Sequence, residues 1–343
     1  ATLDSYRQSQ LAAPRKGEVL LGQIVPVFDA ASAQLRDNPT ALLQSLHVGT
    51  AGAGGAAVAA PGLPDAMPES LVGKAFLDAG WLNAQQLGGF KAYVAGGIAV
   101  DAAVQVAPGG EIALYAPEVA VNAGLSARGG SIALGDIVNK LASGGNGWID
   151  IAIAPAPKGQ TAGIKVASGV TLDTRGLWSQ LQLDPSDISG LPYVNGGTVS
   201  LLSSGAVTLS AGSVIDTSSG AATLANGKLQ GGRGGNITLK SNQNDTDGKG
   251  SAALVMDGEL RGYGVKGGGT LSIDSGIGVA IGGGVLAENG ILPAGQSVPV
   301  HLTLAEAFTI KAGTVLDRDF SYITNHLAPG QVLLDLLAFS VSR

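Results

Sequence analysis

The sequence predicts an all-β solenoid, in which short strands stack as the successive coils of a parallel β-helix. The first observation is composition: glycine accounts for 54 of the 343 residues, aromatic residues for 4% and charged residues for 13%. Typical globular domains contain about 7% glycine and about 25% charged residues. Small side chains and many glycines suit short strands, tight corners and closely stacked backbones. The second and third observations are a strand-like texture and a repeated motif.

The strand-like texture begins after residue 88. Short runs rich in Val, Ile and Thr alternate there with Gly-Gly, Asn-Gly and Pro. The runs recur roughly every 8 to 12 residues, which is the spacing of short strands separated by turns. This texture predicts an all-β fold with loop or helical insertions.

The repeated motif consists of two glycines, any residue, an aliphatic residue, a small residue and a second aliphatic residue. Its copies are residues 109–114, 129–134, 196–201, 234–239 and 268–273. Alternation places both aliphatic side chains on one face of a strand, and a single strand cannot bury that face alone. Stacked coils would join these faces into one narrow core, and the glycine pair would permit a sharp corner before each strand.

A second unit lies between copies of the first. It has a small residue, glycine, a polar residue, two aliphatic residues and aspartate, or a looser form of this pattern. Its copies are residues 167–173, 211–216 and 312–317. The first two copies of the glycine motif begin 20 residues apart, which suits one turn of a three-sided β-helix.

A β-sandwich is the competing all-β fold. It would predict more aromatic core residues and two-residue hairpin turns. The low aromatic content and the recurring coil length favour the solenoid.

The chain divides into two predicted regions. Residues 1–88 are expected to form a capping or inserted mixed subdomain, in which apolar residues at helical spacing predict a helix within residues 29–46. Residues 89–343 are expected to form the β-helix. Excursions from it are expected near residues 140–160, 178–196 and 285–300.

Composition also limits the partners. The chain has no cysteine, which excludes a disulfide scaffold and a thiolate metal site. The net charge of −6 and the absence of a basic run argue against nucleic acid as a partner. No run reaches the roughly 18 apolar residues of a membrane helix.

Several runs resemble the large filamentous-haemagglutinin-type exoproteins of two-partner secretion systems. They are residues 164–178, 206–220, 231–239 and 257–273. The resemblance implies a right-handed β-helix passenger that is exported through a dedicated outer-membrane β-barrel transporter. Residues 1–88 do not match the N-terminal secretion domain of that family, so we expect an interior portion of a longer chain.

Two patterns lack the partners that their chemistry needs. The histidines His47, His301 and His326 have no neighbour at metal-ligand spacing and belong to no catalytic signature. Residues 262–267 have the glycine spacing of a phosphate loop, but no helix-forming segment follows them. We expect surface histidines and no phosphate site.

Asp245 and Asp247 form a weak candidate for calcium, because oxygen ligands alternate there before Gly248. Gln243 would occupy the first ligand position, and Leu254 the position of the bidentate glutamate. A polar corner loop is the alternative interpretation. We expect no bound metal and no cofactor.

A set of acidic and basic residues is the candidate for catalysis. β-Helix enzymes that cut acidic polysaccharides gather such residues on one outer face. The set here is Asp173, Arg175, Asp216, Asp257, Glu259 and Arg261. Aspartates directly after strands are also ordinary corner residues that accept backbone hydrogen bonds, and this is the interpretation that we favour.

The best candidate for recognition is an excursion that contains Trp178, Asp184, Asp187 and Tyr193. Prolines in this segment block strand continuation, and excursions from a solenoid commonly carry specificity. A carbohydrate or another cell-surface ligand would suit it.

The three tryptophans, Trp81, Trp148 and Trp178, are expected to plug the ends of the core or to cover insertions. Stacking on sugar rings is the alternative role for them, because the indole has an apolar face and a polar N–H group.

Together these features predict a secreted bacterial surface adhesin or structural stalk segment, attaching cells to one another, to a host or to a biofilm matrix. We expect it not to be an enzyme. The alternatives are a polysaccharide-degrading β-helix enzyme and the stalk of a contact-dependent toxin delivery protein.

Overall fold

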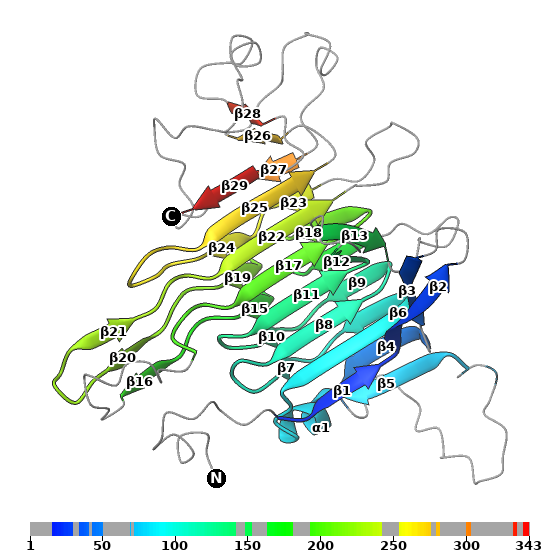
Figure 1. Ribbon diagram of the computed structural model, residues 1–343, viewed down its shortest axis with the longest axis horizontal. Coiled ribbons are helices and arrows are strands. Elements are labelled where there is room, and N and C mark those ends of the chain that lie inside the picture. Colours follow the sequence, from blue (N-terminus) through cyan, green and yellow to red (C-terminus); the bar gives the residue numbers. More distant parts are fainter. Residues whose placement is uncertain are drawn as a thin grey trace.

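The structure is a computed structural model, and its regular elements are almost all β-strands (Figure 1). It describes residues 16–29, 34–40, 43–50, 69, 72–141, 148–152, 163–180, 193–241, 254–275, 279–281, 300–302, 332–334 and 339–342. Within these ranges the one α-helix is α1 (Ala79–Ala84), and no helix is long and apolar enough to cross a membrane.

The first of three parallel ladders starts at the N-terminal end of the molecule. Figure 1 shows its strands side by side in chain order. They are β1 (Glu18–Leu21), β6 (Gly89–Val100), β8 (Glu111–Tyr115), β11 (Ser131–Gly135), β17 (Thr198–Leu202), β22 (Asn236–Ser241) and β25 (Thr270–Ser275). Every neighbouring pair among them is parallel.

The second ladder shares the long strand β6 with the first, since residues 89–93 pair with β8 and residues 97–100 pair with β9. Its other strands are β5 (Lys74–Asp78), β4 (Leu43–Gly49), β9 (Glu118–Val121), β14 (Gly163–Val166), β18 (Ala206–Leu209), β23 (Leu254–Met256) and β27 (Val300–Leu302). All of its pairs are parallel as well.

The third ladder consists of very short strands. They are β7 (Val104–Gln105), β10 (Leu125–Ser126), β15 (Thr171–Asp173), β19 (Val214–Asp216) and β24 (Glu259–Arg261). From β6 to β25 the chain visits the first, second and third ladders in the same order on each successive pass. The structure thus confirms an all-β fold built on parallel sheets.

The glycine motifs of the sequence lie directly on top of one another. Ile132 of one copy is in register with Ile112 before it and Val199 after it, and the same register continues into the remaining copies. A side chain on Gly197 would collide with the backbone carbonyl of Gly130, and the second glycines of the neighbouring motifs are placed in the same way. The motif therefore needs glycine because the backbones of neighbouring first-ladder strands touch at this point.

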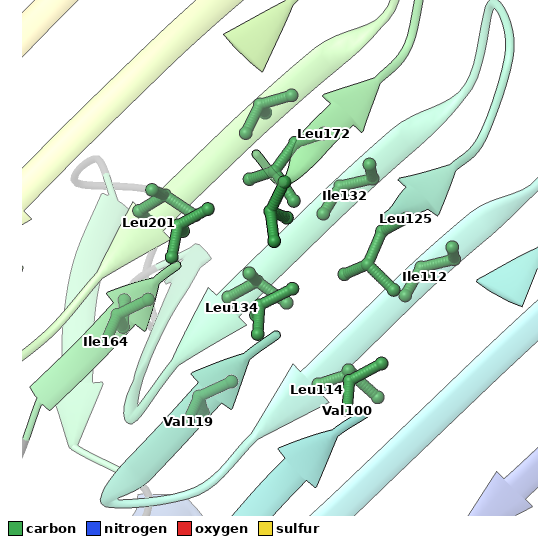
Figure 2. Close-up of a cluster of buried hydrophobic side chains, with 14 of the residues drawn as sticks. Val100, Ile112, Leu114, Val119, Leu125, Ile132, Leu134, Ile164, Leu172 and Leu201 are labelled. Atoms are coloured by element: carbon green, nitrogen blue, oxygen red, sulfur yellow. The ribbon is translucent and has the colours of Figure 1, made fainter. Parts of the chain in front are cut away.

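The core is a narrow space between the three ladders. Aliphatic side chains at alternate strand positions fill it, and Figure 2 shows them pointing toward one another from all three ladders. Examples with at most 1% exposure are Ile112, Leu114, Val119, Leu125, Ile132, Leu134, Ile164, Leu172 and Leu201. Burying each of them contributes roughly 1.5–3 kcal/mol.

Helix α1 packs at the N-terminal end of this core. Asp78 caps it by accepting a 2.6 Å hydrogen bond from the backbone N–H of Trp81. Ala79 and Leu82 are buried and belong to the core cluster. Strand β5, directly before the helix, is the outermost strand of the second ladder.

The helix predicted within residues 29–46 is wrong. The region contains β3 (Gln34–Thr40), antiparallel to β2 (Gln23–Asp29), and the start of β4. Leu46 and Val48 of β4 are buried at strand spacing against β6. Pairing with a neighbouring strand outweighed the local helical spacing.

Antiparallel pairs interrupt the parallel ladders. The pair β12 (Ile137–Leu141) and β13 (Trp148–Ala152) follows β11. In a small separate sheet, β20 (Ala221–Thr223) is antiparallel to β21 (Leu229–Gly231) and parallel to β16 (Trp178–Gln180). Near the C-terminus, β26 (Val279–Ile281) pairs with β28 (Val332–Leu334), and β29 (Phe339–Ser342) with β25.

The expected excursions fall on different parts of this layout. The region near 140–160 includes β13, and the region near 178–196 begins at β16. Residues 285–299 lie outside the described residues. Strands β1 and β4, which precede residue 89, pair in parallel with β6.

Candidate functional site

Charged residues gather at the C-terminal ends of the third-ladder strands. Asp173, Asp216 and Arg261 end three neighbouring strands and are in register with one another. The preceding residue in each strand is aliphatic and buried in the core. Alternation along the strand therefore turns the charged side chains away from the core.

Asp173 is held by a fork of two hydrogen bonds. Arg175 donates from Nε to Oδ1 at 3.0 Å and from Nη2 to Oδ2 at 2.8 Å. Arg128 lies 3.8 Å from Oδ1 and donates to the carbonyl oxygen of Arg175 at 3.0 Å. Partial burial by itself raises the pKa of Asp173, but hydrogen bonds from Arg175 and the nearby positive charges hold it below its usual value.

Glu259 and Arg261 form a second fork two strands further along the third ladder. Arg261 donates from Nε to Oε1 at 2.8 Å and from Nη2 to Oε2 at 2.6 Å. These hydrogen bonds lower the pKa of the Glu259 carboxyl. Both forks have the bidentate geometry that makes a guanidinium–carboxylate pair specific.

Asp216 lies between the two forks and is held more loosely. Its side chain is 8% exposed, and Oδ1 accepts a 3.0 Å hydrogen bond from the backbone of Ser218. Oδ2 is 3.9 Å from Arg175 Nε and 3.8 Å from Arg261 Nη1. Both separations exceed a direct hydrogen bond, so the hydrogen-bonding capacity of Oδ2 is not used up by either guanidinium.

An open cavity of about 650 Å³ adjoins Asp216, and we call it the aromatic hollow. Its lining residues are Arg175, Trp178, Asp216, Ser218, Ser219, Tyr263, Gly264, Val265 and Gly268. Three of its large side chains face solvent to an unusual degree: Trp178 is 65% exposed, Val265 51% and Tyr263 43%. The hollow thus combines exposed apolar surface with a buried carboxylate.

The backbone around the hollow is fixed by hydrogen bonds between coils. Ser218 Oγ accepts from the backbone N–H of Tyr263, and Ser219 Oγ from that of Val265, both at 3.2 Å. The N–H of Ser219 donates in turn to the carbonyl of Tyr263 at 2.7 Å. The aromatic and aliphatic rim is therefore attached to the third ladder.

Of the two predicted recognition residues that the structure describes, Trp178 lines the hollow and Tyr193 does not. Tyr193 has a positive φ of 53°, and its side chain lies against the corner glycines Gly109 and Gly129. Asp184 and Asp187 lie outside the described residues. The two described residues consequently have different roles: Tyr193 packs against the glycine corners, and Trp178 lines the cavity.

The expected role of the tryptophans as plugs is wrong for two of them. Trp81 on α1 is 51% exposed, and Trp178 is the most exposed large hydrophobic residue of the described part. The aliphatic α1 residues Ala79 and Leu82 are buried in the core at that end. Trp148 lies in β13.

The structure brings together five of the six residues considered for catalysis. Asp257 is the exception, since it lies exposed in the turn before β24. In the other five, the carboxylates face guanidinium groups along the third ladder.

The remaining candidates give no ligand set. His47 Nε2 is 2.6 Å from Asp101 Oδ2 at the surface, and His301 lies in β27. His326, Asp245 and Asp247 lie outside the described residues. Within the described part of the chain, no three His, Cys, Asp or Glu side chains are placed to hold a metal ion.

Of the residues that line the hollow, only Arg175, Trp178 and Asp216 were predicted as site residues. Sequence reasoning missed the others, among them Ser218, Ser219, Tyr263 and Val265. The strand register could have revealed some of them. Arg175, Ser218 and Tyr263 each lie two positions after the end of a third-ladder strand. Aligning the coils on their buried aliphatic residues would have placed these three side by side.

Comparison of the chain with protein-family models, with curated proteins and with solved structures finds no match. The resemblance to filamentous-haemagglutinin-type exoproteins therefore stays a prediction. A role for the chain has to be inferred from the ladders and from the aromatic hollow.

Proposed function

We propose that the ladders are coils of a right-handed parallel β-helix, and that the chain is a stalk segment of a secreted bacterial surface protein that attaches cells to surfaces or to one another. One observation carries this proposal: successive passes of the chain place the same motif in register in the same ladder. Crossovers between parallel strands are right-handed in nearly all proteins, which supports the handedness.

This architecture suits a load-carrying spacer. Each added coil lengthens the molecule by about 4.8 Å, and its apolar residues are buried mainly against neighbouring coils. Length and stiffness then follow from the number of coils. Export through an outer-membrane β-barrel partner is part of the same proposal and rests on the sequence resemblance.

The outer side of the third ladder supplies the surface for attachment. Exposed Trp178 and Tyr263 sit there on a rigid scaffold, beside an open hollow. Exposed aromatic groups on rigid elements are typical of recognition surfaces.

Catalysis on acidic polysaccharides is the less favoured alternative. A general acid at neutral pH needs a raised pKa, whereas the forks lower the pKa of Asp173 and Glu259. A stalk that delivers a toxin would share the same ladders, and only the parts of such a protein beyond these coils would separate it from an adhesin.

Small-angle X-ray scattering of the purified chain tests the stalk. We expect the skewed pair-distance distribution of an elongated particle, with a peak near the cross-section width and a tail that extends to a longer maximum dimension. A symmetric distribution typical of a compact globe would remove the basis for a stalk.

Beads coated with the chain test attachment. We expect them to adhere to bacterial cells or to matrix polysaccharide more than beads coated with heat-unfolded chain. Equal retention of both kinds of bead would contradict an adhesive role.

A further inference from the structure

We propose that the aromatic hollow binds a neutral pyranose unit of a glycan chain. The proposal rests on the adhesive role above and names the ligand that would occupy its surface. Three features of the hollow carry it: the exposed aromatic side chains, the gap beside Asp216 and the balance of charge.

The aromatic side chains offer the apolar half of a sugar site. The C–H face of a pyranose ring is apolar and packs on indole or phenol rings, whose edges remain polar. Trp178 is 65% exposed and Tyr263 43%, although both belong to a region with its backbone hydrogen bonds in place. Such exposure costs hydrophobic free energy that a stacked sugar would recover.

The gap beside Asp216 offers the polar half. A hydroxyl both donates and accepts, so one sugar hydroxyl can donate to Oδ2 and accept from a guanidinium. At separations of 3.9 Å to Arg175 and 3.8 Å to Arg261, a hydroxyl oxygen that lies beside the pair, on the cavity side, can be within hydrogen-bond distance of both partners. A carboxylate that is 8% exposed and already accepts from Ser218 is a fixed acceptor for that hydroxyl.

The balance of charge favours a neutral ligand. Three guanidinium groups face three carboxylates here, so the group has no net formal charge. They are Arg128, Arg175 and Arg261, with Asp173, Asp216 and Glu259. An acidic sugar would bring its carboxylate toward Asp216, and Arg175, the one cation among the lining residues, already donates to Asp173.

The size of the hollow fits this class of ligand. A cavity of about 650 Å³ falls within the roughly 300–1,000 Å³ of small-molecule sites. Because the cavity is open, an inner or terminal sugar unit of a longer glycan can enter it from the side.

Saturation-transfer NMR and tryptophan fluorescence on the whole chain test the proposal. The probes are cellohexaose, laminarihexaose, maltohexaose, mannohexaose and chitohexaose, with hexagalacturonate as the acidic comparison. We expect at least one neutral hexasaccharide to bind and hexagalacturonate to bind more weakly. If none of the neutral hexasaccharides binds, or if hexagalacturonate alone binds, the proposal is overturned.

Two variants locate the binding. Trp178→Ala is expected to weaken it about tenfold, the order expected for loss of a stacked ring. Trp81→Ala is the matched control, because Trp81 is 51% exposed but lies on α1 outside the hollow. Equal affinity of Trp178→Ala and wild type would place the ligand elsewhere and refute the assignment.

Asp216→Asn is the second test within the hollow. It keeps an oxygen for Ser218 but lowers the acceptor strength toward a sugar hydroxyl, so we expect weaker binding by several-fold to tenfold. Should this variant fail to fold, Trp178→Ala still decides the question.

The outcomes separate this inference from the proposed function. An elongated particle that binds no neutral sugar overturns the sugar site and leaves the stalk. A compact particle with Trp178-dependent sugar binding overturns the stalk and leaves the site.

Discussion

The first and third ladders have corners of different composition: glycine in the first, mostly charged residues in the third. Before the first-ladder strands, paired glycines bring adjacent backbones into contact. After the third-ladder strands, the corner residue changes from Ser126 to Asp173, Asp216 and Arg261 along the stack. At the glycine corner an added side chain would collide with backbone, so this corner sets the register. The charged corner differs from strand to strand and carries the candidate site.

The largest expected effect comes from adding a methyl group at a glycine corner. In Gly197→Ala the new Cβ would collide with the carbonyl oxygen of Gly130, and backbone on both sides prevents relaxation. We expect a loss of about 3–5 kcal/mol in unfolding free energy, measured by urea denaturation.

Gly124→Ala is the matched control at the other side of the molecule. Its Cβ would meet only the carbonyl of Thr171 at 3.4 Å, an ordinary contact. We expect a change within about 0.5 kcal/mol. Similar losses in the two variants would remove the distinction between the corners.

A smaller effect is expected from the charged corner. The pKa of Asp173 is lowered in the folded chain, so its pairing stabilises the fold above its unfolded pKa of about 3.9 and loses that contribution as pH falls through the folded pKa. We expect Asp173→Asn to cost about 1–2 kcal/mol at pH 7 and progressively less as the pH falls below about 4.

Urea denaturation at several pH values between 7 and 3 measures this difference. Asp257→Asn is the control, since Asp257 lies exposed in a turn of the same region. A penalty for Asp173→Asn that stays constant down to pH 3 would contradict the ion-pair account.

The smallest effect on stability is expected at the rim of the aromatic hollow. Trp178→Ala and Tyr263→Ala remove exposed rings, so each should change the unfolding free energy by less than about 0.5 kcal/mol. Thermal unfolding followed by circular dichroism checks this. A large loss in either variant would assign the ring to packing instead of ligand contact.

The sequence predicted the regular part of the fold because the same local interaction repeats. Each glycine motif carries its own corner and its own two buried positions, so Ile132 or Ile237 can be placed without knowing the rest of the chain. The helix predicted within residues 29–46 was wrong because β4 takes its conformation from β6, which lies far away in sequence.

The candidate site was predicted only in part for a related reason. The Asp173–Arg175 fork joins residues two positions apart, so the sequence alone shows that they belong to the same corner. Tyr263 meets Trp178 in one cavity only because β15, β19 and β24 stack in register. Single-sequence patterns do not contain that geometry until the register is known.

Engineered disulfides measure the register directly, and the absence of native cysteine gives a clean background. Ser131 and Thr198 are partners in adjacent first-ladder strands, so the double variant Ser131→Cys/Thr198→Cys should cross-link on mild oxidation. Asn236 lies one coil further, about 10 Å from Ser131, so Ser131→Cys/Asn236→Cys should not cross-link within one chain. Peptide mapping that finds the reverse pattern, or no difference between the two, would contradict parallel coils stacked in register.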